Sequence, residues 1–323
     1  MQSQVKVSDT VQQLLRCPIC KAELESRSEH YRCKNSDCNF LFPIIRGIPI
    51  LIDENCSVFS IDDFVSQRNT TFYFSQNKLE QAVRRFVPEI SRNIKGKENY
   101  DELAKLLLSR SSTPRVLVIG GSIQGAGLEA IIAYQSIELV DTDVSFGPRT
   151  AIVCDAHSLP FEDDSFDGVI VQAVLEHVVD PWQCAEEIHR VLKENGLVYA
   201  ETPFMQQVHG GRYDFTRFTH LGHRRLFRRF EEIESGALCG SAMALAWSYK
   251  YFLLSFAKSS FLRRLIGVFA KLTSFYLTYF DYLLIDKPGT LDAASAYYFM
   301  GRKSNRILSD KDLLKLYKGL DQT

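Results

Sequence analysis

The hydrophobic pattern is clearest in RVLVIGGSIQGAGLEAI, residues 115–131, where an apolar run leads into a glycine-rich turn and then into a helical pattern. The run predicts a buried strand because it is short, apolar and followed at once by glycine. The glycines lie at positions 120, 121, 125 and 127. That spacing does not match the G-x-G-x-x-G register of a dinucleotide-binding turn, so the turn alone identifies no ligand.

Two further apolar segments follow, and each precedes an acidic residue. Residues 137–142 predict a short second strand before Asp143, and AIVC predicts a short third strand before Asp155. An acidic residue at the end of the second strand, about 20 residues beyond a glycine turn, can accept hydrogen bonds from both ribose hydroxyls of an adenosine cofactor. This arrangement fits NAD and S-adenosylmethionine equally well.

Amphipathic spacing predicts helices on both sides of the central unit. KLEQAVRRFVPEI (78–90) and YDELAKLLLSR (100–110) each place apolar residues on one face. Residues 57–113 are therefore predicted to be a charged helical connector. Residues 310–323 predict a C-terminal helix and tail.

Four of the eight cysteines lie close together near the N-terminus, in a C-x2-C pair and a C-x4-C pair separated by twelve residues. Two such pairs can place four thiolates tetrahedrally around one zinc ion, and the metal then substitutes for the core that a short segment lacks. We expect a small β domain over residues 1–56 with a structural Zn²⁺; four reduced cysteines without metal are the alternative. The candidate ligands are Cys17, Cys20, Cys33 and Cys38.

The segments LLRCPIC and FPIIRGIPILID resemble a zinc-ribbon family that includes the eukaryotic activator subunit of tRNA, rRNA and release-factor methyltransferases. The resemblance covers roughly residues 12–53. In that family the ribbon packs on a methyltransferase and stabilises it. The resemblance therefore implies that a methyltransferase domain follows in this chain.

The segment after Asp143 distinguishes between the two cofactors. Residues 114–235 closely resemble class I S-adenosylmethionine-dependent methyltransferases. Four segments carry the resemblance and occur in the order typical of that family: Asp155-Ala156, LPF, SFDGVIVQAVLEHV and EIHRVLKENGLVYAETP. The resemblance implies an α/β fold with a Rossmann-like seven-stranded sheet, and S-adenosylmethionine as cofactor. We assign residues 114–309 to this domain.

The resemblance also implies roles for individual residues. The Asp155 position binds the adenine amino group, the backbone amide that follows supports the ring, and the Asp143 position holds the ribose. Gln172 and Ala173 border the methionine moiety. The candidate cofactor-binding residues are Gly120, Gly121, Gly125, Asp143, Asp155, Ala156 and Gln172.

Two departures from the family pattern leave alternatives open. Val118 stands where members commonly carry an acidic residue late in the first strand. The glycine turn is also longer, so either Gly125 or Gly127 could approach the cofactor. A degenerate, non-catalytic domain is the alternative to an active one.

The segment after the fifth strand concentrates titratable and aromatic side chains. MQQVHGGRYDFTRFTHLGHRRLFRRF resembles the same segment of bacterial methyltransferases associated with sugar and surface-glycan biosynthesis. His209 is the first candidate for a general base, because histidine titrates near neutral pH and this residue follows the strand end. Asp214 is the second, although Asp214 and Arg217 could instead form a structural ion pair. For His177, the family pattern favours a structural or cofactor-side role.

The last two strands of the sheet are predicted at 230–236 and 295–303, which leaves an α-helical insertion at about 237–294. The insertion is rich in large aromatic residues, carries Lys and Arg, and has no acidic residue before Asp281. Its uncharged runs are too short to span a membrane. We expect residues 243–285 to lie on an anionic membrane surface or to hold a lipid-linked acceptor. A helical lid, or a contact with a second subunit in a homo-oligomer, is the alternative.

The charge distribution argues against a nucleic-acid partner. The whole chain has a net charge of −1, but residues 115–234 contain ten basic and nineteen acidic residues. Binding of polynucleotide phosphates requires an excess of Lys and Arg. The N-terminal MQSQVKVSDTVQQLLR resembles no secretory signal, so we expect a cytoplasmic protein, peripheral on the inner face of the cell membrane if the insertion binds lipid.

These features predict an S-adenosylmethionine-dependent methyltransferase that O-methylates a sugar or lipid-linked saccharide in cell-surface glycan biosynthesis. An RNA or protein methyltransferase with a built-in activator ribbon is one alternative. The acidic domain and the lack of an Asn-Pro-Pro-Tyr type motif after the fourth strand count against it. A non-catalytic scaffold is the other alternative.

Overall fold

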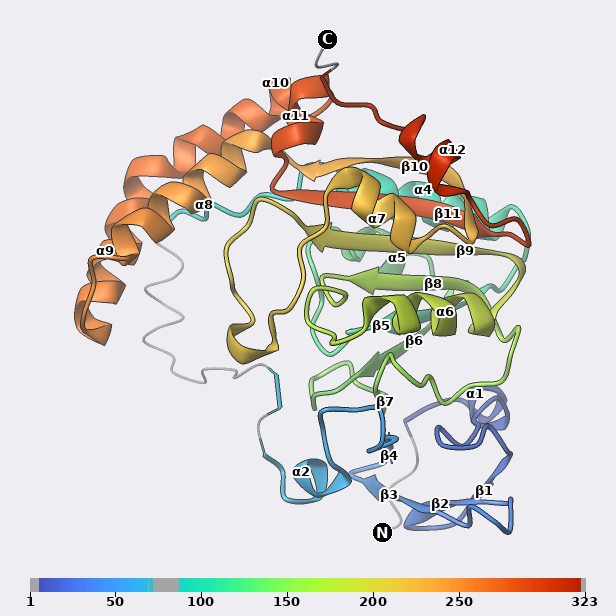
Figure 1. The fold of residues 1–323 in the computed structure, drawn as a ribbon. Helices are drawn as coiled ribbons and strands as arrows, with labels where there is room; N and C mark the ends of the chain where they lie inside the picture. Colours follow the sequence, from blue (N-terminus) through green and yellow to red (C-terminus); the bar gives the residue numbers. More distant parts are fainter. Residues whose placement is uncertain (1–5, 69, 72–86, 321–323) are drawn as a thin grey trace.

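The computed structural model describes residues 6–68, 70–71 and 87–320, and a single eleven-stranded sheet runs through them (Figure 1). The strand order is β1-β2-β3-β4-β7-β6-β5-β8-β9-β11-β10. Most of the helix expected at 78–90 falls outside the described residues.

Seven strands form the central part of the sheet. Their bounds are β5 (Arg115–Ile119), β6 (Glu138–Asp143), β7 (Ile152–Cys154), β8 (Phe166–Gln172), β9 (Leu192–Pro203), β10 (Phe230–Cys239) and β11 (Ala296–Lys303). The strands from β7 to β9 are parallel, whereas β11 is antiparallel to both β9 and β10. This confirms the predicted α/β sheet with an antiparallel hairpin at its end. The strand order reverses between β5 and β8, and ligands bind beside such a reversal in open α/β sheets.

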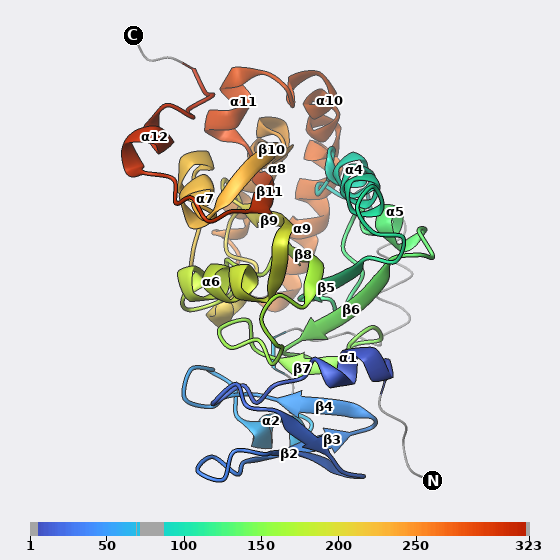
Figure 2. The ribbon, with the colours of Figure 1, turned by 90° about the vertical axis from the view of Figure 1, so that its right-hand side faces the viewer.

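Helices cover both faces of the central sheet (Figure 2). They are α4 (Gly96–Leu108) and α5 (Glu129–Ile132) on one face, and α6 (Pro181–Val191) and α7 (His220–Leu226) on the other. The strand β5 is apolar after Arg115 because both of its faces are buried there: Val116 and Val118 pack with α4, whereas Leu117 and Ile119 pack with α6. The carboxylate of Asp180 caps the start of α6.

The N-terminal unit consists of short elements joined to the edge of the central sheet. They are α1 (Asp9–Gln13), β1 (Leu24–Ser26), β2 (His30–Cys33), β3 (Leu41–Ile45), β4 (Ile48–Leu51) and α2 (Ile61–Val65). The strand β4 pairs in parallel with β7, with Ile50 opposite Val153 and Leu51 opposite Cys154. The four-cysteine unit therefore shares backbone hydrogen bonds with the cofactor-side edge of the sheet, which the sequence pattern did not indicate.

The insertion between β10 and β11 forms a helical arm that extends beyond the sheet (Figure 1). Its elements are α8 (Ser241–Leu254), α9 (Ser260–Ser274), η2 (Phe275–Phe280), α10 (Asp281–Leu284) and α11 (Pro288–Ala293); α12 (Asp310–Leu314) follows β11. The buried Asp281 carboxylate accepts hydrogen bonds from the amides of Ala242 and Met243, each at 2.9 Å, and so joins α10 to the start of α8. The predicted helical insertion is confirmed. Within the described ranges, no helix is both long and apolar enough to cross a bilayer.

Candidate functional site

A pocket lies at the carboxyl ends of β5, β6, β7 and β8. Its wall is mostly apolar, with several valines and Phe59 from the connector. The wall includes four of the predicted cofactor-binding residues, together with the histidine for which the sequence favoured a structural or cofactor-side role. These are Gly120, Asp143, Asp155, Ala156 and His177.

The first glycines of the turn are required by the backbone. Gly120 has φ of +76°, and a Cβ atom there would lie 2.2 Å from Cγ2 of Val174. A Cβ atom on Gly121 would meet the Asp141 carboxylate at 2.8 Å. The next amide, that of Ser122, donates a hydrogen bond of 3.1 Å to Oδ2 of Asp143. The turn is therefore fixed against the end of β6 with its backbone facing the pocket.

Gly125 and Gln172 support the turn from outside the pocket. A Cβ atom on Gly125 would lie 1.7 Å from Oε1 of Gln172. The Gln172 amide donates to the carbonyl of Ala126 at 3.0 Å and to the Glu201 carboxylate at 2.8 Å. These contacts favour a supporting role for both residues, while the neighbouring Ala173 lines the pocket.

The two departures from the family pattern have structural explanations. Val118 is buried in the core beneath α4, so it offers no polar group to the pocket. Gly127 has φ of +91°, and a Cβ atom there would lie 2.7 Å from the backbone of Gly96 at the start of α4. The longer turn thus allows the close packing of helix α4, and neither departure blocks the pocket.

Asp155 is held by two side chains from different parts of the chain. Ser57 Oγ donates to Oδ2 of Asp155 at 2.6 Å, and His157 donates to Oδ1 from its amide at 3.0 Å and from Nδ1 at 2.6 Å. Nε2 of His157 accepts from the Asp180 amide at 3.0 Å, which identifies Nδ1 as the protonated ring nitrogen. Ala156, between the two residues, is buried and lines the pocket.

The two predicted carboxylates have different electrostatic environments. Burial raises the pKa of Asp143, and the hydrogen bonds from Ser122 compensate only in part. Burial also acts to raise the pKa of Asp155, but the bonds from His157 and Ser57 outweigh it and lower that pKa. Asp155 is therefore the more firmly ionised of the two acceptors.

The segment after β9 brings His209 next to Glu176 and His177. Nε2 of His209 lies 3.6 Å from Oε1 of Glu176, and the rings of His209 and His177 are nearly perpendicular with centroids 5.0 Å apart. Burial lowers the pKa of His209, but the Glu176 carboxylate raises it by more. The structure thus places the first general-base candidate against a buried carboxylate beside the pocket.

Asp214 is engaged in holding this segment together. Its Oδ2 accepts hydrogen bonds from the amides of His209 and Gly210, at 2.8 and 3.0 Å, and from Nη2 of Arg217 at 3.0 Å. Burial acts to raise the pKa of Asp214, but Arg217 and the two amides hold it well below its usual range. A carboxylate with so low a pKa is a weak base, so the geometry favours the structural ion pair with Arg217.

Three residues of this region were not singled out by the sequence pattern. Glu176 directly precedes His177 in the apolar run VLEHV, and a charged residue inside such a run can indicate a buried functional group. His157 has a local signal as well, because it lies two residues after Asp155. Ser57 has none, since it meets Asp155 across 98 positions of sequence.

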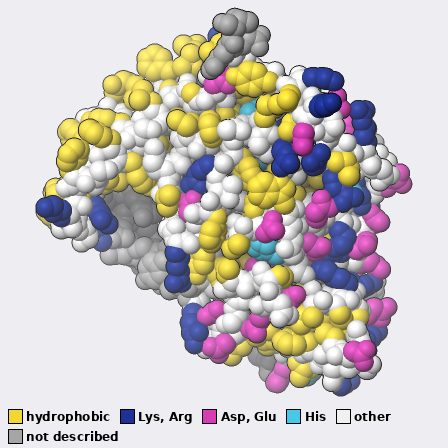
Figure 3. Space-filling model, viewed as in Figure 1, with side chains coloured by type: hydrophobic (Ala, Val, Ile, Leu, Met, Phe, Trp, Pro, Cys, Tyr) yellow, Lys and Arg dark blue, Asp and Glu magenta, His cyan; other side chains and the backbone are white. Residues whose placement is uncertain are grey.

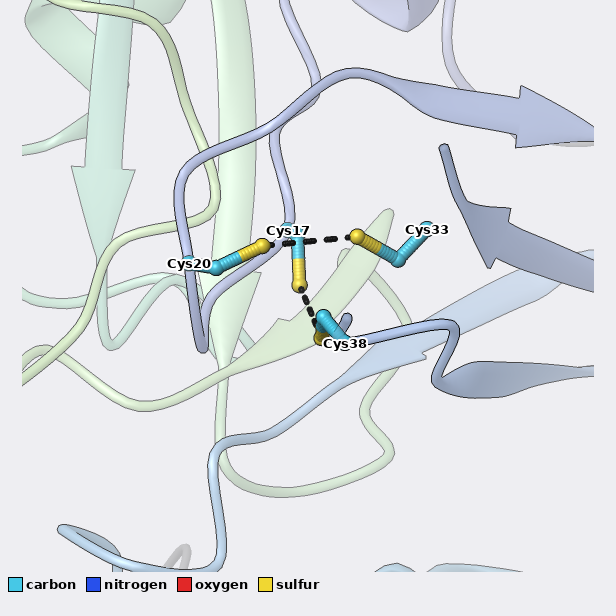
Figure 4. Close-up of side chains that lie close together, drawn as sticks. All are labelled: Cys17, Cys20, Cys33 and Cys38. Carbon is cyan, nitrogen blue, oxygen red and sulfur yellow. Dashed lines mark hydrogen bonds between the residues drawn. The ribbon is translucent and has the colours of Figure 1, made fainter. Parts of the chain in front are cut away.

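The four N-terminal cysteines converge in the structure (Figure 4). The sulfur atoms of Cys17 and Cys38 lie 3.8 Å apart, those of Cys20 and Cys33 lie 3.4 Å apart, and no disulfide joins them. All four lie within 4.8 Å of one another. Tetrahedral zinc with bonds of about 2.3 Å requires sulfur separations of about 3.8 Å. The cluster therefore fits the predicted zinc ribbon.

Comparison with known proteins identifies part of the chain. A family model described as a methyltransferase domain matches residues 129–200. A demethylmenaquinone methyltransferase of Clavibacter sepedonicus is 48% identical over 44 residues, which is 14% of this chain and 18% of that relative. The match thus spans less than a fifth of the curated relative.

Solved structures similar to this chain have low sequence identities and low TM-scores. One similar chain comes from a complex of the Haloferax volcanii Trm112 methyltransferase activator and a methyltransferase. The alignment has 20% sequence identity and a TM-score of 0.37, and it covers 68% of this chain and 99% of that chain. A Haemonchus contortus phosphoethanolamine N-methyltransferase is 17% identical, covers 63% of this chain and 53% of that chain, and has a TM-score of 0.39. With the family match and the observed sheet order, the chain contains a methyltransferase domain with the class I S-adenosylmethionine-dependent methyltransferase fold.

Proposed function

We propose that this protein is an S-adenosylmethionine-dependent methyltransferase that O-methylates a sugar or a lipid-linked saccharide in cell-surface glycan assembly. The observation that carries the proposal is the pocket at the carboxyl ends of β5 to β8. It combines the glycine turn with Asp143 and Asp155, two carboxylates on neighbouring strands. The methyltransferase family match, residues 129–200, covers β6, β7 and β8 but begins after β5 and the glycine turn.

The residues of the pocket suit an adenosine cofactor. Asp155 offers a firmly ionised acceptor for the adenine amino group, and Asp143 lies where it can accept from ribose hydroxyls. Apolar side chains such as Phe59 and Val178 provide surfaces for the ring. The cofactor itself supplies an electrophilic methyl group on a sulfonium.

The protein must then orient an acceptor hydroxyl and remove its proton. His209 is the candidate proton acceptor, because it lies beside His177, which lines the pocket. Asp214 and Arg217 position His209 through its backbone amide. In this proposal Asp214 positions the segment and does not take the proton.

A structural zinc ion in the ribbon completes the proposal. The sulfur positions of the four cysteines fit a closed tetrahedral site, which has no position for substrate. The parallel pairing of β4 with β7 then connects the metal site to the strand that ends at Asp155.

The helical arm provides a surface for the lipid part of the acceptor or for the membrane itself. On α9, Phe261, Leu265, Phe269 and Leu272 form one stripe and expose 51–70% of their surface. Figure 3 shows hydrophobic side chains gathered along the outer edge of this arm. Residues 235–280 contain five basic and no acidic residues. Such a surface favours an anionic lipid bilayer.

Calorimetry with S-adenosylmethionine tests the first part of the proposal. Folded, zinc-loaded protein should bind the cofactor, and failure to bind would instead favour the scaffold alternative. Transfer of a labelled methyl group should then be measured to nucleotide sugars, prenyl-linked saccharides, demethylmenaquinone and bulk RNA. Transfer to a saccharide supports the proposal. Transfer to the quinone or to RNA alone would overturn it.

Flotation with anionic vesicles tests the arm. The variant Phe261→Ser/Leu265→Ser/Phe269→Ser should lose most of its vesicle binding and keep its cofactor affinity. The matched control is Leu41→Ser/Val65→Ser/Ile307→Ser, which replaces exposed apolar residues away from the arm and the pocket. Equal flotation of both variants and the natural protein would refute membrane binding through α9. A change in oligomeric state in the arm variant would indicate a subunit contact instead.

A further inference from the structure

The carboxylate of Glu176 has an unusual environment beside the pocket. Glu176 follows β8, and its side chain is completely buried. Among the described residues, neither of its carboxylate oxygens has a hydrogen-bond partner. Its backbone carbonyl accepts from the amides of Phe215 and Thr216, which fixes the residue against the segment after β9. A buried carboxylate is costly unless it is paired or binds a metal ion.

Two imidazole rings present the same nitrogen to this carboxylate. Nε2 of His177 and Nε2 of His209 each lie 3.6 Å from Oε1 of Glu176. Nδ1 of His177 lies 2.7 Å from the carbonyl of Tyr213, and Nδ1 of His209 lies 3.2 Å from the carbonyl of Gln207. A carbonyl can only accept, so Nδ1 of His177 carries a proton and its Nε2 can present a lone pair. Nδ1 of His209 lies closer to the Gln207 carbonyl than to Nη2 of Arg217, which is 3.4 Å away and can only donate, so the shorter contact favours the same tautomer. Metal-binding histidines typically donate their other ring N–H to a backbone carbonyl in this way.

The geometry points to a metal site. The ligand atoms of Glu176, His177 and His209 all lie within 4.8 Å of one another. With metal–ligand bonds of about 2.1 Å, tetrahedral ligand atoms are about 3.4 Å apart, which is close to the 3.6 Å between Oε1 of Glu176 and each Nε2. We infer that Glu176, His177 and His209 bind a divalent first-row transition-metal cation. Two imidazoles and one carboxylate favour ions such as Mn²⁺, Fe²⁺, Co²⁺ or Zn²⁺.

One of the three candidate ligands, His177, lines the pocket. Three protein ligands leave coordination positions for other oxygen atoms, as in catalytic metal sites. His177 lines the same pocket as Gly120 and Asp155, so an acceptor at these positions adjoins the proposed cofactor. A cation at this place therefore fits an acceptor with two neighbouring hydroxyl groups, which could chelate it.

The proposed metal site rests on the proposed O-methylation. It makes His209 a metal ligand instead of the group that accepts the proton. A metal-bound hydroxyl has a lowered pKa and loses its proton to water before transfer. The new O–CH₃ bond then forms as the S–CH₃ bond breaks, so the neutral thioether leaves and no oxidant or reductant is needed. His209 acts as a ligand, and the cation takes over the acidification of the hydroxyl.

Manganese binding tests the site without requiring turnover. Mn²⁺ prefers oxygen and nitrogen ligands to thiolates, so zinc-loaded full-length protein should keep zinc in the cysteine cluster. Loss of the electron paramagnetic resonance signal of free Mn²⁺ would measure binding, with S-adenosylhomocysteine present. We expect one saturable site. Glu176→Gln and His209→Asn should each weaken binding by roughly tenfold or more.

Two control substitutions test whether any loss of Mn²⁺ binding is specific to the proposed site. Glu194→Gln and His30→Asn replace the same residue types away from the site and should bind Mn²⁺ like the natural protein. If Glu176→Gln does not fold, His209→Asn, on the segment after β9, decides. The inference would be overturned if the natural protein did not bind Mn²⁺, or if folded Glu176→Gln and His209→Asn bound Mn²⁺ as tightly as the natural protein. Glu176 and His209 would then form only an ion pair. Cofactor binding in the same sample would show that the proposed function still stands.

Discussion

Glu201 offers a quantitative test of the core beneath the pocket. It lies on β9, almost fully buried, and accepts hydrogen bonds from Tyr199 and Gln172, each at 2.8 Å. Burial raises the pKa of Glu201 from its ordinary 4.5 to about 7, although those hydrogen bonds act to lower it. The replacement Glu201→Gln keeps the shape and removes the charge.

The sign of the effect follows from proton binding. The folded state binds the Glu201 proton more tightly than the unfolded state, so the contribution of this group to stability is present below about pH 4.5 and is lost as pH rises through about 7. Each unit of pKa difference between the folded and unfolded states corresponds to about 1.4 kcal/mol of unfolding free energy. Full ionisation of Glu201 therefore lowers the unfolding free energy by about 3 kcal/mol. Relative to Glu201→Gln, the natural protein should therefore lose about 2.5 kcal/mol of unfolding free energy between about pH 5 and about pH 8.

Urea unfolding at a series of pH values measures this difference, with circular dichroism as the readout. Glu194→Gln, which removes an exposed carboxyl group from the same strand, is the control for the loss of one acidic residue. A difference between the natural protein and Glu201→Gln that stays constant across the pH range would refute the reasoning. It would mean that water reaches the Glu201 carboxylate in the folded protein.

Further substitutions test the site and the ribbon. Asp155→Asn should weaken S-adenosylmethionine binding by roughly 10- to 100-fold, because a hydrogen bond to a charged group contributes about 1.5–3 kcal/mol. Ser57→Ala should have a smaller effect in the same calorimetric assay, and equal losses would contradict direct contact by Asp155. Gly120→Ala should lower the melting temperature, since the left-handed backbone costs about 1–2 kcal/mol and the Cβ atom meets Val174. Cys38→Ser should abolish stoichiometric zinc measured by mass spectrometry, and retention of zinc would exclude a four-cysteine site.

The strands and their order follow from local patterns in the sequence. The apolar run before Gly120 and the short runs that end at Asp143 and Asp155 are strands in the structure, and the last two strands form the expected hairpin. The strands β5 and β7 were predictable because burial on both faces leaves a short apolar run, which is followed by glycine or aspartate. The helical insertion was predictable from its length and aromatic content.

Contacts between residues far apart in the sequence could not be predicted from local patterns. The spacing around Gln172 places it at the end of β8, but only its packing against Gly125 shows that it faces the turn. The role of Glu176 depends on His209, which lies 33 positions away and is brought close by the segment after β9. Periodicity reports which face of an element is buried, and it contains no information about which distant polar groups share that face.

The junction between the ribbon and the sheet gives the metal cluster a physical connection to the cofactor pocket. Oγ of Ser158 donates to the carbonyl of Pro18, between the first two cysteines, at 2.6 Å. Leu51 pairs with Cys154, the residue before Asp155. Because the ribbon has little core of its own, zinc is expected to keep Pro18 and β4 in place. With zinc bound, residues 154–158 would be held by partners whose positions depend on the metal. We therefore expect that removal of zinc weakens cofactor binding, although none of the ribbon's four cysteines lines the pocket.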